Sequence, residues 1–243
     1  KKSSSSKLWG GRFAHSTAAS VEVFSASIDY DSRLYRYDIA GSKAHATMLA
    51  ANGLLSKEEL QAIVDGLSEI EEEIDSGEFQ FRQELEDIHM NIEKALADRI
   101  GPAGAKLHSA RSRNDQVALD LRLYLRDQCD LLVELLDHVR RGFATLARTY
   151  LGAIMPGYTH TQRAQPVLFS HPFMAYYEMF SRDTERLQDG LARINVMPLG
   201  SAALAGTPHP IDRKYTADLL GFKKVSANSM DAVADRDFMI EFV

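Results

Sequence analysis

The sequence predicts an all-α protein, and three observations support this class. Apolar residues recur at helical spacing in several segments, and two of these are long enough to be helices of a bundle. Gly53, Gly77 and the pair Gly101-Pro102 follow three of the segments as stop signals. No stretch of convincing length alternates apolar and polar residues as a strand would. With 243 residues, 45% of them apolar, the chain can bury a sizeable core.

Three helices are predicted in the amino-terminal part. The first covers residues 34–51, and the second begins at Ser56, which forms a capping box with Glu59. The third carries apolar side chains from Ile88 to Ile100. We therefore expect an amino-terminal helical domain over 8–111, preceded by a disordered terminus over 1–7 that has too few apolar residues to order itself.

Two much longer helices follow. An apolar stripe runs from Val117 to Tyr150 without a proline, so a helix of about 35 residues, near 50 Å long, is expected from Asn114 onward. A second long helix is predicted from Pro166 to Ile194, antiparallel to the first. Shorter helices are predicted near 213–220 and from about Asp231.

Apolar side chains still recur at the last residues, without a cap, Gly or Pro. The expectation is that the chain stops inside a helix. Residues 112–243 would then form the first part of a central helical-bundle domain, with the rest of the bundle and a carboxy-terminal domain absent.

Composition excludes several classes of protein. A net charge of −6 with dispersed Lys and Arg argues against a nucleic-acid partner. No apolar run approaches the roughly 18 residues that cross a bilayer, and no signal sequence opens the chain, so a soluble intracellular protein without a membrane partner is expected. Cys129 is the only cysteine, which excludes an intrachain disulfide and favours a small buried side chain in a reducing compartment.

The most informative segment is His108 to Gln116, which is almost entirely polar and directly precedes the first long helix. Arg111 and Arg113, with Ser, Asn and Gln donors at a helix amino terminus, would suit a carboxylate ligand. The same residues also fit a helix cap with surface salt bridges, because helix starts are commonly polar. Spacing alone leaves both interpretations open.

A second polar segment, Pro156 to Pro166, is predicted as a loop between the long helices. His160 in this loop could act as a general acid or base near neutral pH. On pattern alone, a histidine that only hydrogen-bonds to the backbone is the commoner case.

Asp87 and His89 are two residues apart and should point to different faces of a helix, which is poor spacing for a shared metal. Acids in a first helical turn have a structural explanation in the helix dipole. Metal-ligand spacings such as His-Glu-x-x-His or paired Cys are absent, as is a Gly-x-Ser-x-Gly elbow, and residues 101–107 do not match a phosphate loop. No metal and no cofactor are predicted.

Taken together, the segments Leu8 to Phe13, His108 to Gln116 and Gly157 to Pro166 resemble argininosuccinate lyases of the fumarase and aspartase superfamily. Further matches at 86–89, 198–200, 205–207, 211–213 and 235–238 make the resemblance collinear from about Lys7 to the end. Residues 87–93 resemble plant and algal members most closely, which implies the plastid stroma as an alternative to the cytoplasm.

The resemblance implies a fumarase/aspartase-type helical bundle and the reversible β-elimination of argininosuccinate to arginine and fumarate. In such an enzyme a base removes a proton beside a carboxylate, and the guanidino nitrogen leaves. Carried over by position, His160 is the catalytic acid or base. The substrate-binding positions would be Ser27, Asp87, His89, Ser112, Arg113, Asn114, Thr159 and Gln162. The family is homotetrameric, with a twenty-helix bundle and active sites that draw on three subunits.

The sequence also departs from the family. The flexible loop with the other catalytic residue, a serine, is absent, so the 243-residue chain alone is expected to be inactive. Thr161 replaces the usual Leu, and Ser109 the usual Thr. Two alternatives stay open: a sister lyase that acts on adenylosuccinate, fumarate or aspartate, and a structural protein related to the delta-crystallins.

Overall fold

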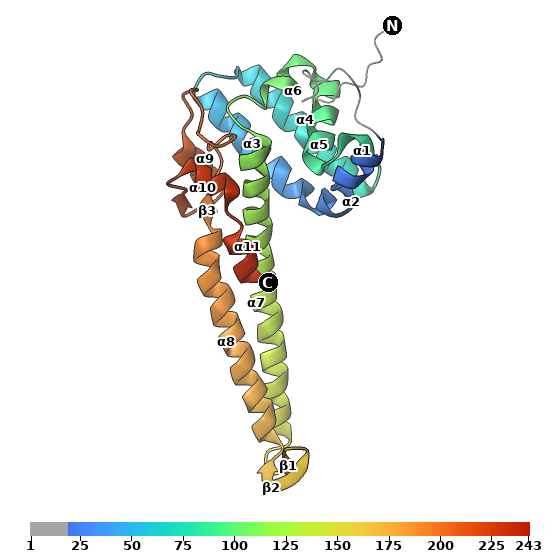
Figure 1. Ribbon diagram of the computed structural model, residues 1–243, viewed down its shortest axis with the longest axis vertical. Coiled ribbons are helices and arrows are strands. Elements are labelled where there is room, and N and C mark those ends of the chain that lie inside the picture. The colour runs from blue at the N-terminus through green and yellow to red at the C-terminus, as the bar shows by residue number, and fades with distance from the viewer. Residues whose placement is uncertain (1–18) are drawn as a thin grey trace. The chain divides into compact units, whose positions relative to one another are not determined.

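The computed structural model describes residues 19–243, most of which are helical, and the predicted all-α class is confirmed (Figure 1). The predicted terminus 1–7 and the segment Leu8 to Phe13 lie outside the described residues. None of the described helices is long and apolar enough to cross a membrane. The helices are α1 (Ala19–Ser25), α2 (Ile28–Asp31), α3 (Tyr35–Ala51), α4 (Lys57–Ser76), α5 (Ile88–Ile100), α6 (Pro102–Lys106), α7 (Arg113–Thr149), α8 (Ser170–Ile194), α9 (Arg213–Leu219), α10 (Ser229–Ala234) and α11 (Asp237–Phe242).

Four short strands and two single 3₁₀ turns complete the described secondary structure. The 3₁₀ turns are Ser32–Leu34 and Gln83–Leu85. Strands β1 (Ile154–Thr159) and β2 (Gln162–Leu168) form one two-stranded sheet, and β3 (Val196–Met197) and β4 (Lys224–Val225) form another.

By its internal contacts the chain divides into two compact units. Of the described residues, one unit contains 19–121 together with 197–235, and the other contains 122–196 and 236–243. Residues 197–235 thus pack with the amino-terminal helices. The predicted domains, 8–111 and 112–243, stay a prediction.

The amino-terminal helices begin and end where their sequence signals predicted. Ser56 accepts a hydrogen bond from the backbone N–H of Glu59, whose side chain accepts one in return, which is the predicted capping box at α4. Gly77 ends α4 in the left-handed conformation, with φ of 77°. Asp87 caps α5 by accepting a hydrogen bond from the backbone N–H of Met90.

Large apolar side chains from α3, α4, α5 and α7 form the core of the first unit. Two glycines let these helices approach closely: a Cβ on Gly41 would lie 2.8 Å from Leu119, and one on Gly66 would lie 2.8 Å from Leu96. Each such side chain contributes about 1.5–3 kcal/mol when it leaves water. Fully buried members of this core are Ile39, Met48, Leu49, Ile63, Leu67, Ile70, Ile88, Ile92, Leu96 and Leu119.

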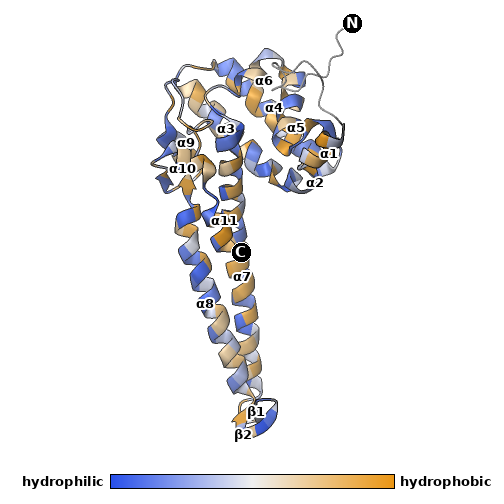
Figure 2. Cartoon of the chain, viewed as in Figure 1, coloured by the Kyte–Doolittle hydropathy of each residue, from blue (hydrophilic) through white to orange (hydrophobic). Residues whose placement is uncertain are grey.

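In the second unit, α7 and α8 run antiparallel, as predicted (Figure 1). Phe143 of α7 stacks on Tyr176 and Phe180 of α8, and Tyr150 contacts Phe169 edge-on. Cys129 is buried, as expected for a small apolar side chain. Several large apolar side chains of α7 are exposed, including Leu131, Leu132, Leu135, Val139 and Leu146, and Figure 2 shows hydrophobic residues along both helices.

The segment between the long helices corrects the sequence prediction. We expected a loop over 156–166 and a helix from Pro166, whereas β1 and β2 form an antiparallel hairpin and α8 begins at Ser170. The turn is His160-Thr161, and both residues have positive φ, 48° and 61°. Hairpin turns of this kind usually carry Asn or Gly, so the residues at the turn gave no signal. A register shift between Pro156 and Tyr158 marks a bulge, where Ala164 and Gln165 of β2 lie opposite Gly157 of β1.

The last segment also differs in detail. The predicted short helix near 213–220 is α9, but the helix expected from about Asp231 to the end is two helices, α10 and α11. The break lies at Asp235, whose ψ of 129° is extended. Before α9, Gly200 has φ of 89°, and a Cβ there would lie 2.7 Å from Ile211, so this turn requires glycine.

Candidate active site

Six of the nine predicted site residues lie in the first unit, at the starts of three helices. Ser27 precedes α2, Asp87 and His89 lie at the start of α5, and residues 112–114 lie at the start of α7. The first two starts are in contact: the backbone N–H of Ser27 donates to the Glu86 carbonyl (2.8 Å), and Asp31 accepts from the backbone N–H of Ile88 (3.2 Å). Ser27 Oγ donates to Asp31 Oδ2 (2.5 Å).

Arg113 connects the starts of α5 and α7. Its Nε lies 3.4 Å from Asp87 Oδ2, its Nη1 donates to Gln116 Oε1 (2.9 Å), and its Nη2 donates to Glu93 Oε2 (3.3 Å). The Arg113 side chain is 26% exposed. Each nitrogen of the guanidinium therefore has an inward partner among the described residues, and one N–H on each of Nη1 and Nη2 remains for a ligand.

The charge on Arg113 also acts on its two acidic partners. Burial raises the pKa of Asp87 and of Glu93, but ionic contacts outweigh burial, and the net pKa of both is lowered. His89 and Arg113 supply those contacts for Asp87, whereas His108 and the arginines supply them for Glu93. Both acids therefore stay ionised near neutral pH and hold Arg113 in place.

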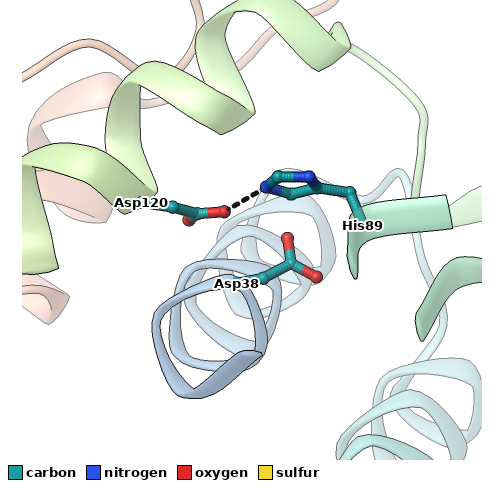
Figure 3. Close-up of side chains that lie close together, drawn as sticks. All are labelled: Asp38, His89 and Asp120. Atoms are coloured by element: carbon teal, nitrogen blue, oxygen red, sulfur yellow. Dashed lines mark hydrogen bonds and ion pairs between the residues drawn. The ribbon is translucent and has the colours of Figure 1, made fainter. Parts of the chain in front are cut away.

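Behind Arg113 lies a buried cluster of three ionisable side chains (Figure 3). Figure 3 shows Asp38 of α3, His89 of α5 and Asp120 of α7 with their polar ends facing one another. His89 Nε2 donates to Asp120 Oδ2 (2.8 Å), and His89 Nδ1 forms an ion pair with Asp87 Oδ2 at 3.7 Å. This ion pair corrects our expectation that Asp87 and His89 point apart: Asp87 precedes the helix as its cap, so its side chain turns back over the first turn.

The acids around His89 favour its charged form. Burial lowers the pKa of His89, but its contacts with Asp120 and Asp87 and the charge of Asp38 outweigh burial and raise the pKa to about 10. Burial and the charge of Asp38 raise the pKa of Asp120, and the contact with His89 opposes this shift. His89 is therefore an imidazolium that donates a hydrogen bond to Asp120.

The same three side chains could in principle hold a cation. Their donor atoms lie within 4.8 Å of one another. A histidine must lose its proton to bind a metal, however, and the raised pKa of His89 opposes that loss. Asp38 also already accepts a hydrogen bond from Gln116. The geometry fits a hydrogen-bonded ionic cluster better than a metal centre.

The residues of the segment His108 to Gln116 differ in burial and contacts. Arg111 is buried and donates to Ser42 Oγ (2.9 Å), so the expectation that both arginines suit a carboxylate ligand is corrected for Arg111. Asp115 is fully buried and accepts hydrogen bonds from the backbone N–H groups of Ser112, Gly200 and Ala202. These two residues have structural roles.

Ser112 and Asn114 are less buried than Arg111 and Asp115. Ser112 Oγ accepts a hydrogen bond from the backbone N–H of Asn114 (3.3 Å) at the start of α7. Asn114 is exposed and its Nδ2 donates to the Ala203 carbonyl (2.8 Å). The turn at 200–203 thus lies beside the amino terminus of α7.

The other three predicted site residues, Thr159, His160 and Gln162, lie together in the β1–β2 hairpin of the second unit. Thr159 and Gln162 are paired across the ladder, and His160 begins the turn that joins them. All three side chains are exposed.

Sequence analysis missed Asp38, Glu93 and Asp120. A signal existed for two of them, because Asp38 follows Leu34 by four residues and Asp120 follows Val117 by three, which places both acids on apolar helix faces. An acid on such a face is expected to have a buried partner. The identity of that partner depends on how the helices pack.

A family model described as lyase matches residues 11–243, so the chain belongs to that family. Two of its curated relatives are argininosuccinate lyases. The protein of Desulfotalea psychrophila is 64% identical over 98% of this chain and 51% of its own length. That of Acinetobacter baumannii is 59% identical over 98% of this chain and 50% of its own. The resemblance to argininosuccinate lyases is confirmed, and the chain spans about half the length of these relatives.

Solved structures support the same fold. A variant of EDDS lyase with bound fumarate matches with a TM-score of 0.79 and 32% identity, over 94% of this chain and 46% of that one. A structure described as fumarate lyase:delta crystallin from Brucella melitensis, bound to cobalt, matches with a TM-score of 0.75 over 95% of this chain and 54% of that one. At 18% identity the second match shows the fold alone.

Proposed function

We propose that this chain forms the amino-terminal half of an enzyme that cleaves argininosuccinate to arginine and fumarate by β-elimination. The observation that carries the proposal is the oriented guanidinium of Arg113, beside Ser112 and Asn114, in a chain 64% identical to an argininosuccinate lyase. The substrate carries three carboxylates, and each needs charged or polar partners once it leaves water.

Arg113 suits one of these carboxylates. One N–H on Nη1 and one on Nη2 remain beyond its inward contacts, and a carboxylate accepts two such bonds. Ser112 and Asn114 add a hydroxyl and an amide at the positive end of a 37-residue helix. A structural neighbour, the EDDS lyase variant, carries bound fumarate, which is a dicarboxylate.

We assign the acid or base role to His160, with Thr159 and Gln162 as neighbouring substrate contacts. An exposed histidine at a hairpin turn is free to meet a ligand that other parts of an assembly hold. We therefore also propose a homotetramer in which different subunits contribute the two groups of residues. The compartment, cytoplasm or plastid stroma, stays a prediction that relatives from two bacteria do not test.

The test is a chimera that joins residues 1–243 to the remaining part of the Desulfotalea psychrophila relative. Release of fumarate from argininosuccinate, followed by its ultraviolet absorbance, is expected from the chimera and not from the 243-residue chain alone. The intact relative is the positive control.

Three outcomes would contradict the proposal. A folded chimera that releases fumarate from adenylosuccinate but not from argininosuccinate would indicate the sister lyase. A folded chimera without any turnover would favour the structural, crystallin-like alternative. Turnover by the 243-residue chain alone would contradict the assignment of catalysis to the longer protein.

A further inference from the structure

Two series of side-chain contacts lead from the buried cluster to Arg113. Both begin at fully buried carboxylates that face His89, those of Asp120 and Asp38. Neither carboxylate is expected to touch a ligand, because their side chains have almost no exposed surface. Their position behind a predicted substrate-binding arginine raises the question of what they do for it.

The first series of contacts runs through His89. Asp120 Oδ2 accepts a hydrogen bond from His89 Nε2–H at 2.8 Å, and His89 Nδ1 faces Asp87 Oδ2 at 3.7 Å. The same Asp87 oxygen lies 3.4 Å from Arg113 Nε. The other Asp87 oxygen is used at the cap of α5, where it accepts from the backbone N–H of Met90 (2.7 Å). Asp87 is thus the shared counterion of an imidazolium and a guanidinium.

The second series of contacts runs through Gln116. Its Nε2 donates to Asp38 Oδ1, so the amide has its oxygen turned toward Arg113. Gln116 Oε1 accepts from Arg113 Nη1 at 2.9 Å. With Glu93 on Nη2 at 3.3 Å, all three guanidinium nitrogens are held from inside the protein.

Other charged groups surround these two series of contacts. Arg111 interacts electrostatically with Asp38, Glu93 and Asp120, and Asp31 interacts with His89 and Asp87. His108 Nδ1 lies 3.5 Å from Glu93 Oε2. A buried ion without a partner is costly, so losing one carboxylate should rearrange its neighbours as well as weaken the fold.

We propose that Asp120 and Asp38 are positioning residues: they fix the guanidinium of Arg113, through His89 and Gln116, at the angle that receives a substrate carboxylate. The role of Arg113 as a carboxylate ligand rests on the proposed function. His89 and Asp87 then act behind Arg113, and a site off by even an ångström binds its ligand poorly.

Nuclear magnetic resonance of the ¹⁵N-labelled 243-residue chain tests the contacts without any activity. The Nε–H signal of Arg113, identified by its loss in Arg113→Lys, is expected to shift in Asp120→Asn and in Asp38→Asn. The matched control is Leu67→Ala, a core change in α4, which should lower stability and leave this signal in place. An unchanged Arg113 signal in both acid variants would overturn the proposal.

Steady-state kinetics of the chimera then test the consequence for the substrate. Asp120→Asn is expected to raise the KM for argininosuccinate about tenfold with a smaller change in kcat, since the lost interaction is one of binding. In a double-mutant cycle, adding Asp120→Asn to Arg113→Lys should change KM little further. Independent effects that multiply, as expected for Leu67→Ala with Arg113→Lys, would assign Asp120 a role in stability alone.

The design separates this proposal from the proposed function. If the wild-type chimera is inactive but the Arg113 signal responds as expected, the network stands and the lyase assignment fails. If the chimera is active and KM is unchanged in both acid variants, the network does not serve binding. Should Asp120→Asn fail to fold, the same measurements on two other variants test the two series of contacts separately. His89→Gln tests the series through His89, and Asp38→Asn tests the series through Gln116.

Discussion

The two groups of predicted site residues are held very differently. At the start of α7, Arg113 has an inward partner on each nitrogen and a fully buried ionic cluster behind it. In the β1–β2 hairpin, Thr159, His160 and Gln162 present exposed side chains around a two-residue turn. One region is thus oriented by its own chain before any ligand arrives, whereas the other depends on what it meets. Preorganisation therefore belongs to Arg113, whereas the proposed acid or base has an exposed side chain.

The largest effect on stability should come from the buried cluster. Asp120→Ala would leave the imidazolium of His89 without its nearest counterion, and breaking a buried pair in this way costs about 3 kcal/mol or more. Gln162→Ala, in the exposed hairpin, should change the free energy of unfolding by less than about 0.5 kcal/mol. Urea denaturation of the 243-residue chain measures both, and equal effects would remove the distinction between the two regions.

The largest effect on turnover should come from the hairpin. In the chimera, His160→Ala is expected to lower kcat by about 100-fold or more, because a general acid or base is lost, with no change in the melting temperature. His171→Ala, which removes another exposed histidine of the same unit, is the matched control. Near-normal turnover in His160→Ala would exclude His160 from the mechanism.

Stability should also depend on pH. The folded pKa of His89, about 10, lies above its ordinary value of 6.5, so its contribution to stability is complete below about pH 6.5 and is lost as the pH rises toward 10. Buried His45 has its pKa lowered to about 3 by burial and by the charge of Arg111, so its contribution is complete above about pH 6.5 and is lost as the pH falls.

Each histidine alone changes the free energy of unfolding by about 1.4 kcal/mol per pH unit within its range. Unfolding midpoints measured across pH should therefore flatten on the basic side in His89→Gln and on the acidic side in His45→Gln. A basic limb that is unaltered in His89→Gln would mean that His89 is not held as an imidazolium.

The smallest effect concerns the hairpin turn. Thr161 is β-branched and has φ of 61°, a conformation that glycine adopts without strain. Thr161→Gly should therefore raise the melting temperature slightly, or leave it unchanged where the greater freedom of the unfolded chain offsets the relief. Gly157→Ala should do the opposite, because its Cβ would lie 2.9 Å from the Gln165 carbonyl. A clear loss of stability in Thr161→Gly would mean that the turn is not strained.

The helices could be predicted because their signals are local. The capping box at Ser56 and the stop at Gly77 act within a few residues, so sequence spacing specified α4 at both ends. The hairpin could not be predicted, since His160 and Thr161 take positive φ without the Asn or Gly that would announce it. Nor could the pairing of His89 with Asp120, because 31 residues separate them and helix packing alone brings them together.

The most direct test of the account is a titration of the ¹⁵N-labelled 243-residue chain with fumarate. If the start of α7 is a preformed carboxylate site, millimolar fumarate should shift the signals of Ser112, Arg113 and Asn114 and leave that of His160 in place. Asp120→Asn should weaken this response. Shifts at the hairpin instead, or equal responses of the wild type and Asp120→Asn, would contradict the claim that the chain orients Arg113 for a carboxylate.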